Sequence, residues 1–343
     1  MRFDALRCFG GAILLAAISG PALAQSKDVN VYSLRQTSLI QPLLDAFTAK
    51  TGIKTNVIFA DKGLIERIAA EGASSPADLL LTADIGFLTS AVDQGIAQPI
   101  KSTVVEANIP ANYRDPGGLW VGLTSRARVV YASKDRVKQD TIAYEELADP
   151  KWKGKICVRS GQHPYNIALL ASMIAHKGEA EAKKWLQGLK ANLATKPSGG
   201  DREQAKAIFS GQCDIAIGNT YYMALMASNP EQQEWAKSVK VLFPNAGDRG
   251  THVNISGVVL AKNAPNKDNA IKLVEFLSSD EAQKLYAELN NEYPLKSGVA
   301  LSDVVKSWGP LKPDPLALAD IGKNRKRASE LVDEVAFDQG PNS

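Results

Sequence analysis

Histidine, cysteine and aromatic residues are scarce in this chain of 343 residues. It contains 3 histidines and 3 cysteines, and aromatic residues make up 7% of it. These scarcities exclude a zinc centre built from histidines and a stacking platform for nucleic-acid bases. The 40 lysines and arginines against 37 acidic residues leave a net charge of +3, which is too weakly basic to indicate a nucleic-acid partner.

Sequence signatures of catalysis and nucleotide binding are also missing. The turn after the first predicted strand, residues 35–38, reads RQTS instead of a glycine-rich phosphate loop. Neither a G-x-S-x-G nucleophile elbow nor an H-E-x-x-H metal motif occurs. We therefore predict a ligand-binding protein that is not an enzyme. An exported enzyme that uses Asp84, His163 or His252 as acid–base groups is the alternative.

Residues 1–24 have the pattern of a secretory signal. Two arginines precede an apolar stretch from Gly10 to Ile18, and residues 22–24 form an A-x-A cleavage site. The apolar stretch is far shorter than the ~20 residues that a membrane-spanning helix needs. We predict cleavage after Ala24 and an exported mature chain that begins at Gln25, with an uncleaved anchor as the alternative.

Two cysteines remain in that mature chain, Cys157 and Cys213, because Cys8 leaves with the signal. An even number of thiols in an exported protein favours a disulfide between them. Closing the 56-residue loop would stabilise the fold by ~4 kcal/mol in the chain-entropy treatment. Two buried free thiols are the alternative.

The rest of the composition, 45% hydrophobic and 22% charged residues, is typical of a folded globular protein, and the length of 343 residues predicts two lobes. Short β-branched runs alternate with helical patterns such as Leu39, Leu43, Leu44 and Phe47. This alternation predicts an α/β fold with mainly parallel sheets. The predicted strands are Val29–Leu34, Lys54–Ala60, Asp78–Ala83, Val121–Ser133, Lys155–Arg159, Asp214–Gly218, Val239–Phe243 and Val253–Ala261.

Residues 214–222, DIAIGNTYY, carry the most informative chemistry. A buried strand leads into a helix that Asn219 or Thr220 can cap, so Tyr221 and Tyr222 lie at the positive end of the helix dipole. Phenols have a pKa near 10, and a small trivalent cation favours their ionised form. Hard oxygen donors suit Fe³⁺, whereas Zn²⁺ or Cu⁺ would require histidine or cysteine.

From residue 29 to about residue 294 the chain resembles the ferric-ion-binding periplasmic proteins of iron ABC transporters, the bacterial transferrin family. The stretches that carry the resemblance are Val31–Gln36, Phe59–Gly63, Leu79–Asp84, Gly122–Arg128, Arg159–Asn166, Gly218–Tyr222 and Gly250–Gly257. The resemblance implies a two-lobe periplasmic-binding-protein type II fold whose two-strand hinge lies near residues 126–130 and 250–254. It divides the mature chain into an N-terminal lobe and a C-terminal lobe, residues 25–126 with 251–298 and residues 127–250 with 299–343.

The same resemblance implies that Tyr165, Tyr221 and Tyr222 bind Fe³⁺. Some family members place His-Tyr just after the first-strand arginine and obtain metal ligands from that loop. Here those positions are Gln36 and Thr37, so the chain is similar to the subgroup in which three tyrosines and a carbonate-like anion complete the site.

The resemblance further implies that Arg35, Gln36 and Arg126 hold the synergistic carbonate or bicarbonate. Three phenolates neutralise Fe³⁺, so the anion adds negative charge that needs a partner, and guanidinium groups offer planar bidentate donors. We expect Arg35 and Arg126 to meet only when the lobes close. Arg128, two positions along the strand, is a reserve candidate.

Other polar residues receive structural interpretations. We expect His163 on the surface, His176 at a helix C-terminus, and Tyr32 in packing. Asp84 and Asp201 are expected to cap helices.

As a member of this family the chain is expected to be a monomeric periplasmic substrate-binding protein. It would deliver iron to an inner-membrane ABC permease and its ATPase. Two alternatives keep the fold: one binds an organic or inorganic anion without metal, and the other binds Fe²⁺ with an arginine in place of the anion.

Overall fold

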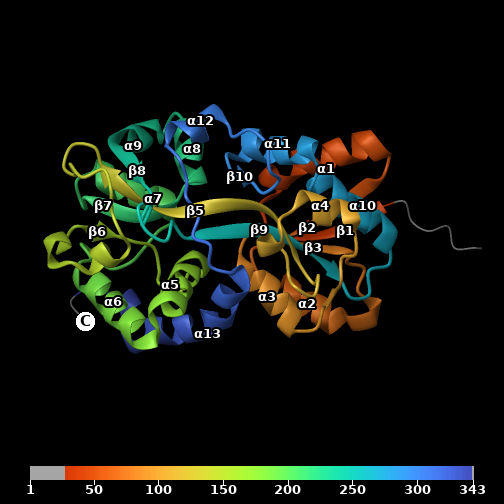
Figure 1. The fold of residues 1–343 in the computed structure, drawn as a ribbon, viewed down its shortest axis with the longest axis horizontal. Helices are drawn as coiled ribbons and strands as arrows, with labels where there is room; N and C mark the ends of the chain where they lie inside the picture. The colour runs from red at the N-terminus through yellow and green to blue at the C-terminus, as the bar shows by residue number, and fades with distance from the viewer. Residues whose placement is uncertain (1–27, 342–343) are drawn as a thin grey trace, which may run out of the picture.

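The computed structural model describes residues 28–341, and the predicted signal 1–24 lies outside this range. The described chain forms two lobes joined by two long strands (Figure 1). The first lobe contains β1 to β4 with α1 to α4, α10 and α11. The second contains β6 to β8 with α5 to α9. Among the described residues, no helix combines the length and apolar character needed to cross a bilayer.

All eight predicted strands occur, together with two short ones. The strand order in the sheet is β2-β1-β3-β9-β5-β7-β6. In addition, β10 and β8 each pair with β5, and β4 pairs with β9. The strands are β1 (Asp28–Ser33), β2 (Lys54–Phe59), β3 (Leu79–Thr82), β4 (Ala97–Gln98), β5 (Val121–Ser133), β6 (Ile156–Cys157), β7 (Ile215–Asn219), β8 (Val239–Leu242), β9 (Val253–Ala261) and β10 (Tyr293–Pro294).

The strands β5 and β9 connect the lobes. Residues 121–127 of β5 pair with β9, and residues 128–132 of β5 pair with β7 in the second lobe. Both long strands run antiparallel to every strand that they pair with, whereas β1 pairs in parallel with β2 and β3. The prediction of mainly parallel sheets is therefore wrong, because strands that cross between lobes and return need no helical crossover.

Helices cover both faces of this sheet. α1 shows how they form: Ile40, Leu43, Leu44 and Phe47 make a buried stripe, and Gly52 ends the helix with a left-handed φ of 70°. The helices are α1 (Thr37–Thr51), α2 (Leu64–Glu71), α3 (Ile85–Asp93), α4 (Thr103–Asn108), α5 (Pro164–Lys177), α6 (Glu179–Ala191), α7 (Asp201–Phe209), α8 (Tyr221–Ala227), α9 (Gln233–Ser238), α10 (Lys267–Leu277), α11 (Asp280–Asn290), α12 (Asp303–Ser307) and α13 (Leu318–Glu334).

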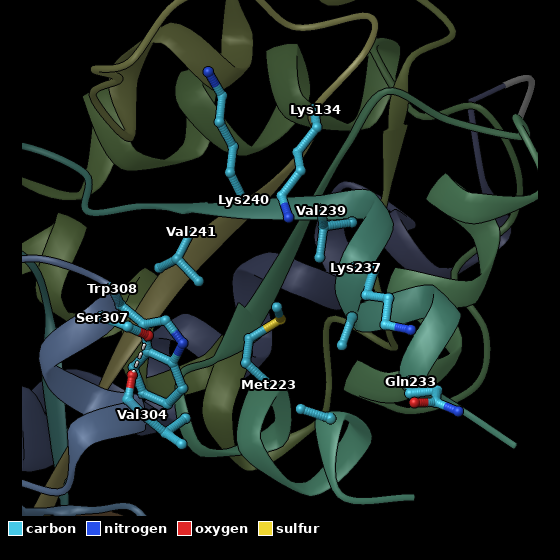
Figure 2. A pocket seen from close by; sticks show the side chains of 12 residues that line it. Lys134, Met223, Gln233, Lys237, Val239, Lys240, Val241, Val304, Ser307 and Trp308 are labelled. Atoms are coloured by element: carbon cyan, nitrogen blue, oxygen red, sulfur yellow. Dashed lines mark hydrogen bonds between the residues drawn. The ribbon is translucent and has the colours of Figure 1, made fainter. Parts of the chain in front are cut away.

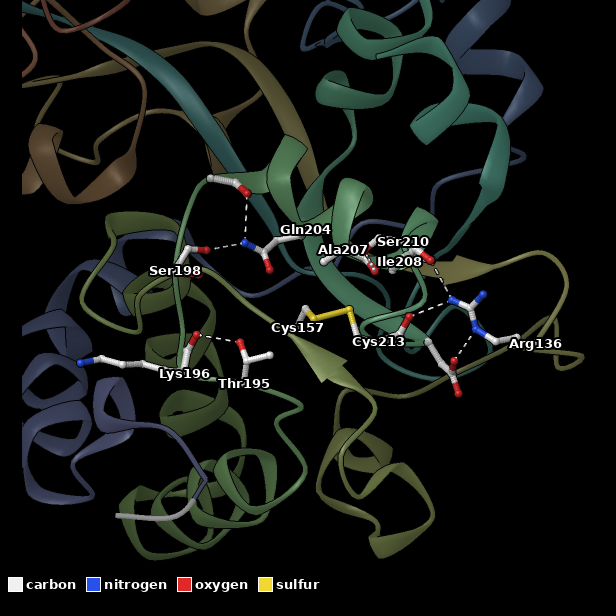
Figure 3. Close-up of a disulfide and its surroundings, with 12 residues drawn as sticks. Arg136, Cys157, Thr195, Lys196, Ser198, Gln204, Ala207, Ile208, Ser210 and Cys213 are labelled. Atoms are coloured by element: carbon white, nitrogen blue, oxygen red, sulfur yellow. Dashed lines mark hydrogen bonds and ion pairs between the residues drawn. A yellow bond between two sulfur atoms is a disulfide. The ribbon is translucent and has the colours of Figure 1, made fainter. Parts of the chain in front are cut away.

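The predicted disulfide between Cys157 and Cys213 is confirmed, with Cα atoms 5.9 Å apart (Figure 3). It joins the end of β6 to the loop between α7 and β7. Because β6 and β7 are neighbouring parallel strands, the bond fastens together the two strands that lead into α5 and α8.

Candidate metal centre

Three phenol side chains meet where the lobes face each other. Tyr165 is the second residue of α5, and Tyr221 and Tyr222 open α8. The hydroxyl oxygens of Tyr165 and Tyr221 are 3.2 Å apart, and the rings of Tyr221 and Tyr222 have centroids 4.3 Å apart. Two helix starts therefore present oxygen donors to one place.

Local sequence explains the start of α5. Pro164 occupies the first helical position, where its missing N–H costs nothing. His163 is the N-cap, and its Nδ1 accepts a hydrogen bond from the Tyr165 N–H at 3.2 Å. Burial, and then the charges of Arg159 and Arg128, lower the pKa of His163 to about 3, so the ring is neutral. The expectation of a surface histidine is wrong, because this cap holds the ring beside Tyr165.

The start of α8 also differs from expectation. Thr220 precedes the helix without capping it, and its hydroxyl instead accepts from the Ala127 N–H at 3.3 Å. Asn219 belongs to β7 and accepts from the Arg128 guanidinium at 3.0 Å. Both side chains thus attach the segment before α8 to β5. This attachment fixes the position of Tyr221, the first residue of α8.

Burial raises the pKa of both phenols of the pair. At Tyr222 burial and the charge that Tyr165 carries when ionised raise the pKa to about 12. At Tyr221 burial is again the largest cause, and the pKa lies well above its ordinary value despite the lowering effect of Arg126. Both phenols are therefore protonated at neutral pH, and a cation that binds them as phenolates must displace their protons.

Arg35 and Arg126 lie beside the phenols and share one carboxylate. Arg35 donates to Glu292 at 2.9 and 3.2 Å, and Arg126 donates to it at 3.2 Å. Ser256 accepts from both arginines, and all four side chains are buried. Burial alone would raise the pKa of Glu292, but the two guanidinium groups hold it below its ordinary range.

This arrangement corrects the expectation that Arg35 and Arg126 meet only on closure. Both come from the first lobe: Arg35 follows β1, and Arg126 lies on the half of β5 that pairs with β9. Two arginines on one carboxylate leave one net positive charge. Nε and Nη1 of Arg126 and Nε of Arg35 have no partner among the described residues, and the Arg126 guanidinium lies 6.0 Å from the Tyr221 ring centre.

A second cluster of two arginines and one carboxylate lies beside Tyr165. Asp201 accepts from Arg128 at 2.6 Å and from Arg159 at 3.2 Å, and it is 1% exposed. Burial alone would raise the pKa of Asp201, but the two arginines lower it below its ordinary value. Their guanidinium carbons lie 5.8 and 5.5 Å from the Tyr165 ring centre.

One prediction is wrong at this cluster. Asp201 is not a helix cap, since Gly200 takes that position and Asp201 is the first helical residue. Arg128, the reserve anion candidate, is held by Asp201 and by the Asn166 side chain at 2.7 Å.

The structure also shows where the other polar residues considered in the sequence lie. Asp84 caps α3 as expected, accepting from the Gly86 N–H at 2.7 Å. Tyr32 is buried and donates to Glu71, and His176 in the last turn of α5 contacts Asp314 at 2.6 Å. His252 is buried, and neither of its ring nitrogens has a partner among the described residues.

All six residues predicted for the site line one cavity of about 480 Å³. Its lining draws on both lobes and includes Arg35, Gln36, Phe87, Arg126 and Glu292 from the first and Arg159, His163, Tyr165, Tyr221 and Tyr222 from the second. Within residues 28–341 no cluster of three His, Cys, Asp or Glu side chains could hold a metal ion.

A larger cavity of about 600 Å³ lies against a different part of α8, where Met223 contributes to its wall (Figure 2). Its lining combines apolar side chains with lysines and two neutral polar residues, and it contains neither phenols nor carboxylates. It therefore offers no hard anionic donor to a trivalent cation.

Glu292, Asp201 and Arg159 are the residues that sequence reasoning missed. Arg159 stands in the stretch that carries the family resemblance, next to the predicted ligand loop, so a signal for it existed. Glu292 has no such signal, because only the pairing of β10 with β5 brings it to the arginines.

The chain is similar to several known proteins. Residues 74–312 match the bacterial extracellular solute-binding protein family. The chain is 45% identical to iron uptake protein A2 of Synechocystis, over 95% of this chain and 94% of the relative. The apo ferric ion-binding protein A of Pasteurella haemolytica is 54% identical, with a TM-score of 0.87 over 91% of this chain and 98% of its own. A Trichodesmium protein solved with iron and citrate ligands is 46% identical, with a TM-score of 0.86 over 90% and 99%.

These relatives are iron-uptake and ferric-binding proteins, not enzymes. They confirm the resemblance seen in the sequence, and their structures confirm the α/β, two-lobed periplasmic-binding-protein type II fold. The chain belongs to the bacterial extracellular solute-binding protein family.

Proposed function

We propose that this protein captures Fe³⁺ in the periplasm with Tyr165, Tyr221 and Tyr222 as phenolate ligands. The observation that carries the proposal is the meeting of these three side chains, with two hydroxyl oxygens 3.2 Å apart, in a cavity shared by both lobes. Three phenolates neutralise the cation, and hard oxygen donors select Fe³⁺ over softer metals.

The synergistic anion, carbonate or bicarbonate, binds at Arg35, Gln36 and Arg126. Since Glu292 neutralises only one of the two arginines, one positive charge and three unpartnered N–H groups remain for the anion. Gln36 is exposed in the cavity wall next to Arg35 and supplies a neutral donor. The Trichodesmium relative was solved with citrate, an organic polycarboxylate, so citrate is the competing anion.

Extracellular solute-binding proteins of ABC transporters work with a membrane permease. We propose that this protein delivers its iron as a monomer to an inner-membrane permease and its ATPase. Its N-terminal lobe comprises residues 25–126 and 251–298, and its C-terminal lobe residues 127–250 and 299–343. The leader 1–24 directs export and is removed after Ala24.

Metal analysis and visible and EPR spectra of the purified protein test this proposal. Iron-loaded protein is expected to be coloured by phenolate-to-iron charge transfer and to show a high-spin ferric signal. Iron bound without that band or signal would support the Fe²⁺ alternative. A metal-free, colourless protein that binds an anion tightly would support the anion alternative.

Loading in carbonate-free buffer, followed by addition of bicarbonate or citrate, identifies the anion. We expect bicarbonate to restore the full charge-transfer band. A band that only citrate restores would assign the site to the organic anion.

A further inference from the structure

The C-terminal helix α13 contacts both lobes. This helix packs against α5 of the second lobe, and its partly exposed Arg327 pairs with Glu179 at the start of α6, at 2.7 Å. Two residues earlier, Arg325 points to the first lobe and pairs with Asp84 at 3.0 Å. The Arg325 side chain is 18% exposed and that of Asp84 is fully buried, so solvent screens this pair weakly.

Asp84 is itself the centre of a small network. It caps α3 through the Gly86 N–H, and it accepts from the Asn254 side chain at 2.6 Å. Asn254 lies on the connecting strand β9, where it pairs with Arg126. The carboxylate thus connects α3, the strand that joins the lobes, and α13.

The same Arg325 nitrogen reaches the metal centre. Its Nη1 also donates to the backbone carbonyl of Pro164, at 3.2 Å. Pro164 is the residue before Tyr165 and lines the cavity with it. One guanidinium nitrogen therefore bridges a carboxylate of the first lobe and the peptide that carries a phenol of the second.

Close packing leaves little freedom at this contact. A Cβ at Gly86 would overlap the guanidinium of Arg325, and a Cβ at Gly322 of α13 would overlap Thr89 of α3. Neither glycine has a positive φ. Both positions therefore need glycine because there is no room for a side chain, and not because of the backbone conformation. α3 and α13 approach each other through these two glycines.

From this geometry we propose that Arg325 is a positioning residue that couples the placement of Tyr165 to the relative arrangement of the lobes. A rotation of one lobe must lengthen its bond to Asp84 or its bond to Pro164, so Arg325 favours the arrangement in which both exist. This inference rests on the proposed role of Tyr165 as an iron ligand.

The first test substitutes Arg325→Gln, with Arg327→Gln as the matched control on the same helix. Spin labels at Val104→Cys and Phe209→Cys, exposed positions in the first and second lobes, report the distance between the lobes in metal-free protein. We expect Arg325→Gln to broaden or shift the distance distribution and Arg327→Gln to leave it unchanged. Equal distributions in wild type and Arg325→Gln would overturn the coupling.

A second variant, Gly86→Ala, displaces the guanidinium while keeping its charge. Alanine favours the helix, so loss of α3 is not expected. Gly247→Ala, at a site with open space, is the control. Gly86→Ala is expected to reproduce the Arg325→Gln distribution, and a wild-type distribution would contradict the proposal.

Two further measurements test whether Arg325 affects Tyr165. Amide hydrogen exchange at Tyr165 and Asn166, without iron, is expected to accelerate about tenfold in Arg325→Gln, a typical coupling between sites. In iron-loaded protein the dissociation rate should rise by a similar factor, but not further when Tyr165→Phe is already present. Additive effects, or unchanged exchange, would overturn the proposal.

Because the distance and exchange measurements need no iron, they separate the two proposals. Failure to bind iron would contradict the proposed function and leave the effect of Arg325 on the lobes and on Tyr165 measurable.

Discussion

The hydroxyl oxygens of Tyr165 and Tyr221 lie 3.2 Å apart although 56 residues separate them in the chain. The same separation divides Cys157 and Cys213, and each cysteine stands eight residues before one of these tyrosines. The disulfide therefore fixes the relative position of two strand–helix units, and each unit presents a phenol at the start of its helix.

Removing this disulfide should weaken the fold. For the Cys157→Ser/Cys213→Ser double variant we expect the free energy of unfolding to fall by about 4 kcal/mol, since the closed loop spans 56 residues. Urea unfolding of both proteins under oxidising conditions measures the difference. An unchanged midpoint and slope would show that the bond does not constrain the unfolded chain.

Breaking the Asp201 cluster should strongly reduce the stability of the fold. Asp201→Asn leaves Arg128 and Arg159 without their buried partner, which costs about 3–5 kcal/mol of unfolding free energy. Asp214→Asn is the control, because its pair with Arg136 is 20% and 39% exposed and contributes only about 0–1 kcal/mol. Chemical denaturation measures the unfolding free energy of both variants. Equal decreases would mean that the buried cluster contributes no more to stability than the exposed pair does.

Arg126→Gln should uncouple iron from its anion. In the wild type, bicarbonate is expected to tighten iron binding, and the loss of charged hydrogen bonds at Arg126 should reduce that gain roughly 10- to 100-fold. The matched control is Arg136→Gln, which removes a partly exposed arginine that does not line the cavity. Titrations with and without bicarbonate test this, and an unchanged bicarbonate effect would contradict the proposed anion site.

Iron binding should weaken as the pH falls. The pKa of Tyr222 is raised to about 12 and that of Tyr221 lies well above its ordinary value, so both phenols hold protons at neutral pH. Binding as three phenolates displaces three protons, so the apparent affinity falls by about a thousandfold for each pH unit lost. Competition with a chelator at several pH values measures the slope. A slope of zero would exclude phenolate ligation by this pair.

The sequence was sufficient for the elements and for bringing six predicted residues to one cavity. Runs of β-branched residues predicted β5 and β9 with the bounds that the structure has, because both strands are buried along their whole length. The family resemblance brought Tyr165 to the Tyr221 pair, a contact that no local pattern could reveal.

What the sequence could not predict are partners that depend on sheet order. Glu292 reaches Arg35 and Arg126 only because β10 pairs with β5. Asp201 looked like a helix cap, since a local role explained it, but tertiary contacts with Arg128 and Arg159 decide its position.

The most direct test of the central claim is the visible spectrum of iron-loaded Tyr165→Phe, Tyr221→Phe and Tyr222→Phe. Tyr32→Phe is the control, because Tyr32 is buried and bonds Glu71 outside the cavity. We predict that each of the three variants loses or shifts the phenolate-to-iron band and releases iron faster, while the control keeps the wild-type spectrum. A wild-type band in all three variants would contradict the account.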